Sequence, residues 1–155
     1  MTNNDILRRL RYTFTLSEAK MIALFGLAEH RVTLAQISGW LKKEDEQGYQ
    51  PCSDPQLALF LNGLINEKRG KKDGPQPQPE QRLTNNIIVR KLKIALNLRD
   101  DGMLAMLALA GVRMSKHELS AFFRKPDHKH YRECHDQILR GFLKGVGLKY
   151  RANGS

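Results

Sequence analysis

The sequence contains an internal duplication, because residues 4–69 align without a gap on residues 86–151 at a constant shift of 82 positions. Roughly a third of the aligned positions are identical, both among apolar residues and among polar ones. The pairs include Asn4 with Asn86 and Gly63 with Gly145. A repeat of this length indicates a duplicated structural unit. We therefore expect two related units, residues 1–69 and 85–155, joined by a linker over residues 70–84.

The linker alternates proline and glutamine between Gly74 and Glu80. This composition favours an extended, fairly stiff segment that resembles polyproline II and adds no core. The segment is interpreted as a spacer. A recognition peptide for a proline-binding domain is the alternative.

Comparing the two copies helps to assign their secondary structure. Tyr12 to Thr15 could form a strand on its own, but its counterpart, Ile94 to Asn97, favours a helix. We therefore expect a helix from about Asp5 to Phe14, with Asn4 as its N-cap, and an equivalent helix capped by Asn86 in the second copy.

Three further helices are expected in each unit, because capping sequences precede apolar stripes of helical period. These sequences start at Thr15, Thr33 and Ser53 in the first copy, and at Asn97 and Ser115 in the second. A glycine lies in the middle of each fourth helix, at positions 63 and 145. The pairing predicts that two helices approach closely there. With no convincing strand, the expected fold is all-α, with two tandem homologous four-helix units.

The charge is distributed unevenly between the two units. Of the net charge of +10, residues 85–155 carry +8, with 14 Lys and Arg against 6 Asp and Glu. A basic half beside a nearly neutral half suggests a polyanionic partner. The sequence also lacks an apolar run of about 20 residues, a signal-peptide pattern and a set of cysteines sufficient for a disulfide scaffold. A cytoplasmic protein without a membrane partner is expected.

Several segments together resemble a known family. They are Asn4 to Arg11, Trp40 to Asp45, Arg69 to Lys71, Gly74 to Pro77 and Arg124 to His128. The chain resembles the YehS-like family of uncharacterised bacterial proteins along nearly its whole length, linker included. The resemblance implies a bacterial cytoplasmic protein with two related helical units. It implies no activity, cofactor or catalytic residue.

Cationic side chains are the candidate nucleic-acid contacts, because lysine and arginine neutralise backbone phosphates. The second unit supplies the main set, with a weaker second face on the first helix: Arg90, Lys91, Lys93, Lys116, Arg124 and Lys125, then Arg8, Arg9 and Arg11. A solvated helix face is the alternative interpretation. The second and third helices of each unit also invite comparison with a helix-turn-helix, although the turn lacks a well-placed glycine.

The loop before the fourth helix matches unusually well between the copies, at Lys43, Asp45, Tyr49, Cys52 and Asp54. One interpretation is a small binding or catalytic site. The other is a plug in which Tyr and Cys pack over the core while the aspartates accept hydrogen bonds from amides. No base accompanies the cysteine in the first copy, which favours the plug. Both cysteines are expected to be free thiols.

A second group of potential ligands lies in the same loop of the second copy, where His128, His130, Cys134 and His135 cluster. Their spacing is not that of zinc ligands, so a surface histidine loop is expected, with no metal and no cofactor. The chain also lacks a glycine-rich phosphate loop, a serine nucleophile motif and paired catalytic carboxylates.

The leading functional hypothesis is therefore a non-enzymatic nucleic-acid-binding or regulatory module with DNA or RNA as its partner. The alternative is a protein-interaction adaptor that uses a groove between the helical units, with an acidic protein as its partner. The sequence indicates no oligomeric state.

Overall fold

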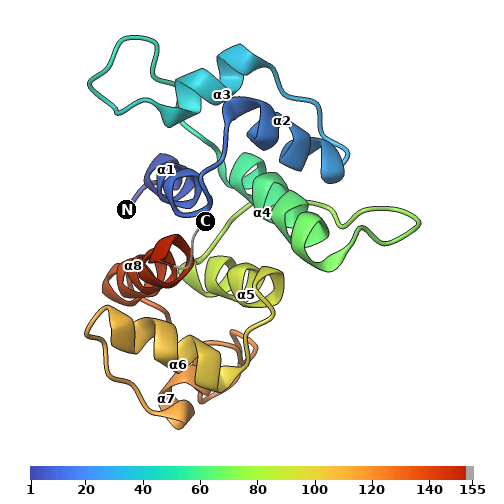
Figure 1. The fold of residues 1–155 in the computed structure, drawn as a ribbon. Coiled ribbons are helices and arrows are strands. Elements are labelled where there is room, and N and C mark those ends of the chain that lie inside the picture. Colours follow the sequence, from blue (N-terminus) through green and yellow to red (C-terminus); the bar gives the residue numbers. More distant parts are fainter. Residues whose placement is uncertain (153–155) are drawn as a thin grey trace.

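The computed structural model describes residues 1–152, which form eight α-helices and, within that range, no strand (Figure 1). The first unit contains α1 (Asn3–Phe14), α2 (Glu18–Leu27), α3 (Leu34–Leu41) and α4 (Asp54–Arg69). The second contains α5 (Asn85–Ala95), α6 (Asp100–Leu109), α7 (Lys116–Ala121) and α8 (Asp136–Ala152). The expected all-α architecture of two tandem four-helix units is confirmed.

The helices are arranged in three layers (Figure 1). The middle layer holds α1, α4, α5 and α8, with α2 and α3 on one side and α6 and α7 on the other. Within the middle layer α1 packs against α8, and α4 packs against α5. The first helix of each unit therefore lies against the last helix of the other unit.

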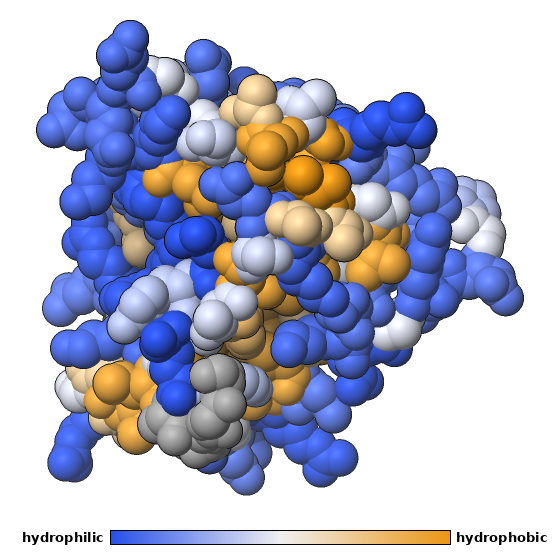
Figure 2. Space-filling model, turned by 45° about the horizontal axis from the view of Figure 1, so that its top comes forward, coloured by the Kyte–Doolittle hydropathy of each residue, from blue (hydrophilic) through white to orange (hydrophobic). Residues whose placement is uncertain are grey.

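The surface is mostly hydrophilic on the face shown in Figure 2, with hydrophobic residues exposed in patches between polar ones. The large hydrophobic side chains that remain exposed are Tyr12, Leu34, Ile94, Leu109 and Leu148. None of the helices described over residues 1–152 combines the length and apolar character needed to cross a bilayer.

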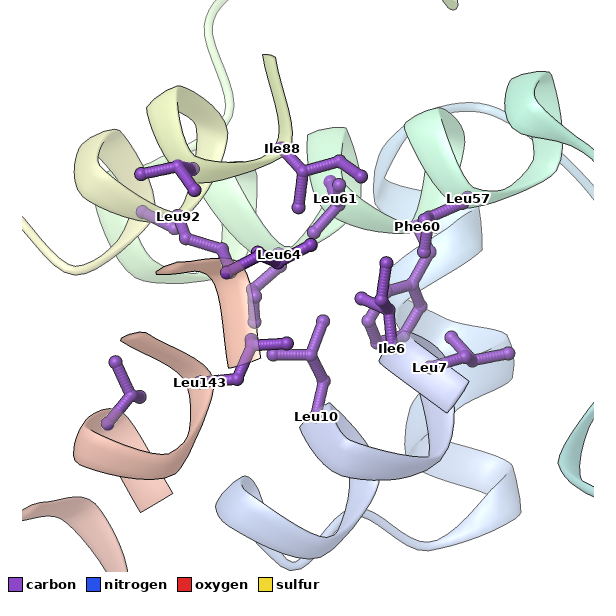
Figure 3. Packing of buried hydrophobic residues seen from close by; sticks show 14 of the residues in the cluster. Ile6, Leu7, Leu10, Leu57, Phe60, Leu61, Leu64, Ile88, Leu92 and Leu143 are labelled. Carbon is purple, nitrogen blue, oxygen red and sulfur yellow. The ribbon is translucent and has the colours of Figure 1, made fainter. Parts of the chain in front are cut away.

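The hydrophobic core is continuous between the units because the middle-layer helices turn their apolar faces toward one another. Figure 3 shows side chains from all four helices meeting at the centre: Ile6, Leu7, Leu10, Leu57, Phe60, Leu61, Leu64, Ile88, Leu92 and Leu143. All ten are buried. Removing such side chains from water is the main driving force for folding, so the stability of each unit depends on the other.

Two equivalent aspartates also tie the units together. The backbone nitrogen of Leu83, which precedes α5, donates to Asp54 Oδ2 at 2.8 Å. At the position related by the repeat, the nitrogen of Met1 donates to Asp136 Oδ2 at 2.9 Å. Each aspartate thus binds the chain that leads into the first helix of the opposite unit.

The N-caps of two helix pairs differ from those expected. Thr2 and Thr84 cap α1 and α5, so the assignment of Asn4 and Asn86 as N-caps was wrong. The cap of α2 is Ser17 and not Thr15, while α6 follows Arg99 with no side-chain cap bond. The physical reason is that both asparagines lie inside their helices and use their amides elsewhere. The expected capping boxes at Thr33 and Ser115 are present, and Ser53, where the fourth helix was expected to start, forms one as well.

The close helix approach expected at Gly63 and Gly145 is confirmed. A Cβ atom on Gly63 would lie 1.8 Å from the carbonyl oxygen of Leu24 in α2. On Gly145 it would lie 1.7 Å from the carbonyl oxygen of Met106 in α6. The backbone of each fourth helix therefore touches the backbone of the second helix in its own unit, and only glycine fits.

The turn between α1 and α2 has a left-handed residue in both copies: Thr15 at φ 51° and Asn97 at φ 52°. A β-branched residue is strained in this region, whereas asparagine tolerates it. We expect Thr15→Asn to stabilise the protein by about 0.5–1 kcal/mol, and Asn97→Thr to destabilise it similarly. Urea unfolding followed by circular dichroism measures both changes. Equal stability of all three proteins would contradict the argument.

The linker returns along the outer side of the contact between α4 and α5. Gln76 Oε1 accepts a hydrogen bond from Asn66 Nδ2 of α4 at 2.8 Å. Closer to α5, Glu80 Oε1 lies 3.0 Å from the ammonium of Lys91. The segment has no helix or strand, and only Leu83 near its end packs, half-buried, against the core; the segment also covers one of the two seams between the units.

Candidate functional site

A groove with a volume of about 1140 Å³ lies along the seam between α1 and α8. One wall comes from α1 and the other from α8, and the turn after α6 closes one side. A smaller hollow of about 340 Å³ continues along the same seam and shares Arg9, Tyr12 and Lys144 with the first. Both units therefore contribute to one elongated groove, which we call the α1–α8 groove.

The lining of the α1–α8 groove is strongly basic. Its cations are Arg8, Arg9, Lys43, Arg140, Lys144 and Arg151. Asp5 is the acidic side chain among the lining residues of the two hollows. Among the ion pairs of residues 1–152, none involves Arg9, Lys43, Arg140 or Lys144. Arg9, Lys43 and Lys144 are thus without an ion-pair partner, whereas Arg140 contributes, after the hydrogen bonds from Asn85 and the Met1 nitrogen, to lowering the pKa of Asp136.

Arg8 differs from the other groove cations because the fold already uses it. It pairs with Asp5 and donates from Nη1 to the carbonyl oxygen of Lys42 at 2.9 Å. The pKa of Asp5 is lowered, chiefly by the hydrogen bond from the backbone N–H of Thr2 and to a smaller degree by Arg8. Arg90 acts equivalently, donating to the carbonyl oxygen of Phe123 at 2.7 Å. Both arginines thus donate to backbone carbonyl oxygens at the end of the third helix of each unit, where the helix itself supplies no hydrogen-bond donor.

An exposed aromatic ring lies in the second part of the groove. Tyr12 is 59% exposed, although the guanidinium carbon of Arg151 lies 4.0 Å from its ring centroid. Arg151 is held there by hydrogen bonds to the carbonyl oxygen of Tyr12 at 2.5 Å and to Thr15 Oγ1 at 3.2 Å. The guanidinium covers one face of the ring, and the groove remains open beside it.

The cations expected from the sequence divide between different parts of the molecule. Arg8 and Arg9 line the α1–α8 groove, whereas Arg11 is exposed outside it. Lys91 lies on the opposite seam, where its side chain is 11% exposed and donates to Asn62 Oδ1 at 2.6 Å besides pairing with Glu80. Lys91 is therefore not accessible to a ligand while the linker covers it.

The other expected cations lie around α5 and α7. The ammonium of Lys93 lies 5.1 Å from the ring centroid of Phe123. Lys116 and Lys125 are exposed, and Arg124 is half-buried beside a small hollow next to α7. With six residues, α7 is less than two turns long, which leaves little length for a recognition helix.

Sequence reasoning missed most of the α8 contribution to the groove. Arg140, Lys144, Leu148 and Arg151 follow one another at intervals of four, four and three residues. This spacing places them on one face of a helix, and it was visible in the sequence. The spacing does not indicate that this face of α8 lies opposite α1 of the other unit.

The buried asparagines explain why the loop before the fourth helix is so similar in both units. Asn4 Nδ2 donates to the carbonyl oxygens of Trp40 at 3.0 Å and Gln50 at 2.8 Å, and its Oδ1 accepts from the Cys52 amide at 3.0 Å. Asn86 makes the corresponding three bonds in the second unit, to residues 122, 132 and 134. The asparagine therefore holds the loop on the first helix, and the shared Tyr49, Cys52 and Asp54 each bond to another part of the chain.

Both cysteines are free thiols, as expected, and both are buried. Burial, with a smaller effect of the aspartate two positions further on, raises the pKa of Cys52 and of Cys134 to about 12. The reactive thiolate is therefore scarce at neutral pH. The arrangement favours the interpretation of the loop as a plug over the core.

The histidines of the second loop are on the surface. His128 Nδ1 accepts a hydrogen bond from the backbone nitrogen of His130 at 3.0 Å, and both residues are exposed. Within residues 1–152, His, Cys, Asp and Glu side chains form no group of three or more that could hold a metal ion.

The fold and the groove define an all-α protein built from a duplicated four-helix unit, with a basic groove where the two copies meet. The chain belongs to the family described as protein of unknown function DUF1456, which matches it twice, over residues 3–70 and 85–152. It is 46% identical over 150 residues to the uncharacterized protein YehS of Escherichia coli strain K12, with 96% of each chain covered. The resemblance to YehS-like proteins is thus confirmed. No solved structure matches the chain.

Proposed function

We propose that the protein binds nucleic acid through the α1–α8 groove, without catalysing a chemical step. The observation that carries this proposal is the charge of the groove. Six cations line an elongated hollow that holds one acidic side chain, and that acid is already paired with Arg8. A basic groove that follows a nucleic-acid backbone gains affinity by releasing the counterions condensed on the phosphates.

The concave shape adds to the argument from charge. Lysines and arginines spread over a convex surface interact weakly with a ligand in water, whereas a cleft lined by one sign of charge concentrates the field. The cations also come from two units, so the groove exists only when both units are packed together. Under this proposal the duplication serves to build the binding surface.

We expect binding that weakens steeply with salt, and a larger loss on neutralising groove cations than on neutralising others. Arg9→Gln combined with Lys144→Gln removes two unpaired groove charges. The slope of log K against log salt concentration should then fall by about 1.4 for a single strand or about 1.8 for a duplex. Fluorescence anisotropy of labelled single-stranded and duplex oligonucleotides over a range of salt concentrations measures the slope.

The matched control is Lys116→Gln combined with Lys125→Gln, which removes two exposed charges outside the groove. A larger effect of the control pair would place the nucleic-acid contact around α5 and α7. The main set of candidate cations was expected there from the sequence. Binding of a protein partner that hardly responds to salt would instead support the adaptor hypothesis.

A further inference from the structure

We infer that the α1–α8 groove binds a single extended strand of nucleic acid, with one unpaired base stacked on Tyr12. This inference rests on the proposed function and narrows it to single-stranded ligands. It draws on the linker, on the charges of the two seams and on the aromatic ring in the groove.

The linker supplies the first argument, because the repeat relates the two seams between the units. The α1–α8 seam corresponds to the α4–α5 seam, and the linker occupies the outer side of the latter. Gln76 bonds to Asn66, and Glu80 pairs with Lys91 at 3.0 Å. The α4–α5 seam thus holds one extended chain, the linker. In that seam the carboxylate of Glu80 pairs with Lys91 of α5, the first helix of the second unit.

The charges supply the second argument, because the open seam is more basic than the covered one. Lys91, which holds Glu80, corresponds to Arg9 at the repeat shift of 82. Its neighbour Asn62 corresponds to Lys144 in the open groove. At the same shift Arg8, Lys43 and Arg151 also have cationic counterparts, Arg90, Lys125 and Arg69, whereas Arg140 corresponds to Ala58. The open seam thus adds Arg140 and Lys144 to a row of cations, and the covered seam pairs its Lys91 with a carboxylate. A chain with a negative charge on every unit is the ligand that such a row suits.

Tyr12 supplies the third argument. Its counterpart in the covered seam is Ile94, so an aromatic ring stands in the open groove where the other seam has an aliphatic side chain. The ring is 59% exposed, and Arg151 covers one face. Tyrosine rings flanked by cations are the usual stacking platforms for unpaired bases. In a duplex the faces of the bases are hidden by their neighbours, so the ring would have nothing to stack on.

The length of the groove agrees with a short single-strand site. From Gln137 to Arg151, the outermost groove residues of α8, the helix rises by about 21 Å. This is enough for a few nucleotides of an extended strand, at the lower end of the roughly 4–16 nucleotides that single-strand binding folds cover.

The test compares ligands that have the same number of phosphates per strand but differ in their bases or in pairing. Four labelled probes of about 12 nucleotides are used in anisotropy at low salt: oligo-dT, oligo-U, an abasic strand and a blunt duplex. A fifth probe, poly-glutamate of similar length, represents an acidic peptide. We expect oligo-dT or oligo-U to bind at least about 10-fold more tightly than the abasic strand and the duplex.

Variants of Tyr12 separate stacking from charge. Tyr12→Ala should weaken binding of the preferred strand by about 5-fold to 100-fold and leave the abasic strand unaffected, while Tyr12→Phe should retain most of the affinity. Tyr12→Trp provides a spectroscopic signature, because a stacked base quenches indole fluorescence. Thermal melting of each variant checks the fold, which is expected to be unaffected because the side chain is largely exposed.

The outcomes distinguish this inference from the proposed function. Equal binding of duplex and single strands, or an equal effect of Tyr12→Ala on the abasic strand, overturns the single-strand inference and leaves nucleic-acid binding intact. Binding of poly-glutamate without binding of any oligonucleotide overturns both. Preferential binding of unpaired strands, with quenching in Tyr12→Trp, supports both.

Discussion

Replacing Gly63 or Gly145 by alanine is expected to destabilise the protein by about 3 kcal/mol or more. The added methyl group would lie 1.8 Å from the Leu24 carbonyl oxygen in one case and 1.7 Å from the Met106 carbonyl oxygen in the other. The obstacle is backbone in both cases, so no side chain can rotate away. The helices must separate, and the buried contacts beside the crossing loosen with them.

Gly26→Ala is the matched control, because Gly26 also lies in a helix but has nothing within 4 Å of an added Cβ. Alanine there should stabilise the protein by about 0.5–1 kcal/mol through helix propensity. Guanidinium unfolding of the three variants measures the differences. A similar loss in all three would show that the close approach is not what makes Gly63 and Gly145 necessary.

Replacing Asn4 by alanine is expected to destabilise the protein by about 3 kcal/mol or more. The change leaves the Cys52 amide and the carbonyl oxygens of Trp40 and Gln50 without the partner that now binds them. An unsatisfied buried group costs about 1–3 kcal/mol, and the site is too enclosed for water to replace every bond. Faster hydrogen exchange at the Cys52 amide is the local readout, alongside unfolding in urea.

Asn4→Asp tests the direction of these hydrogen bonds. A carboxylate has no proton to donate to the two carbonyl oxygens, so burial and those oxygens raise its pKa above the value in the unfolded chain. The variant should therefore be more stable at acid pH and lose stability as the pH rises through the raised pKa. Gln47→Ala, in the exposed part of the same loop, is the control and should change stability little. A pH-independent Asn4→Asp variant would contradict the assigned bonds.

Much of the local structure was predictable from the sequence because it depends on short-range interactions. The capping boxes at Thr33, Ser53 and Ser115 involve residues three positions apart, and the structure contains each of them. The duplication helped further, since the second copy settled the helix that Tyr12 to Thr15 left ambiguous. The close approach at Gly63 and Gly145 followed from finding the same unfavourable residue twice.

The errors at the N-caps of α1 and α5 have a common cause. Asparagine before an apolar run is a typical cap, and sequence alone does not distinguish a cap from an asparagine that turns inward to bind a distant loop. The partners of Asn4 lie 36 to 48 positions away in the chain. Thr2 and Thr84, just before each helix, provide the caps instead.

The candidate site was predictable in its chemistry and not in its place. An excess of positive charge and the cationic first helix are properties of the sequence, and Arg8 and Arg9 do line the groove. Nothing in the sequence pairs α1 with α8. By itself the sequence determined the two helical units, the capping boxes that start α3 and α7, and the sign of the charge, because neighbours along the chain decide these. Only the tertiary structure decided which cations share a surface, because each unit buries its apolar face against the other. That packing covers Lys91 with the linker and leaves its counterpart Arg9 open beside Lys144.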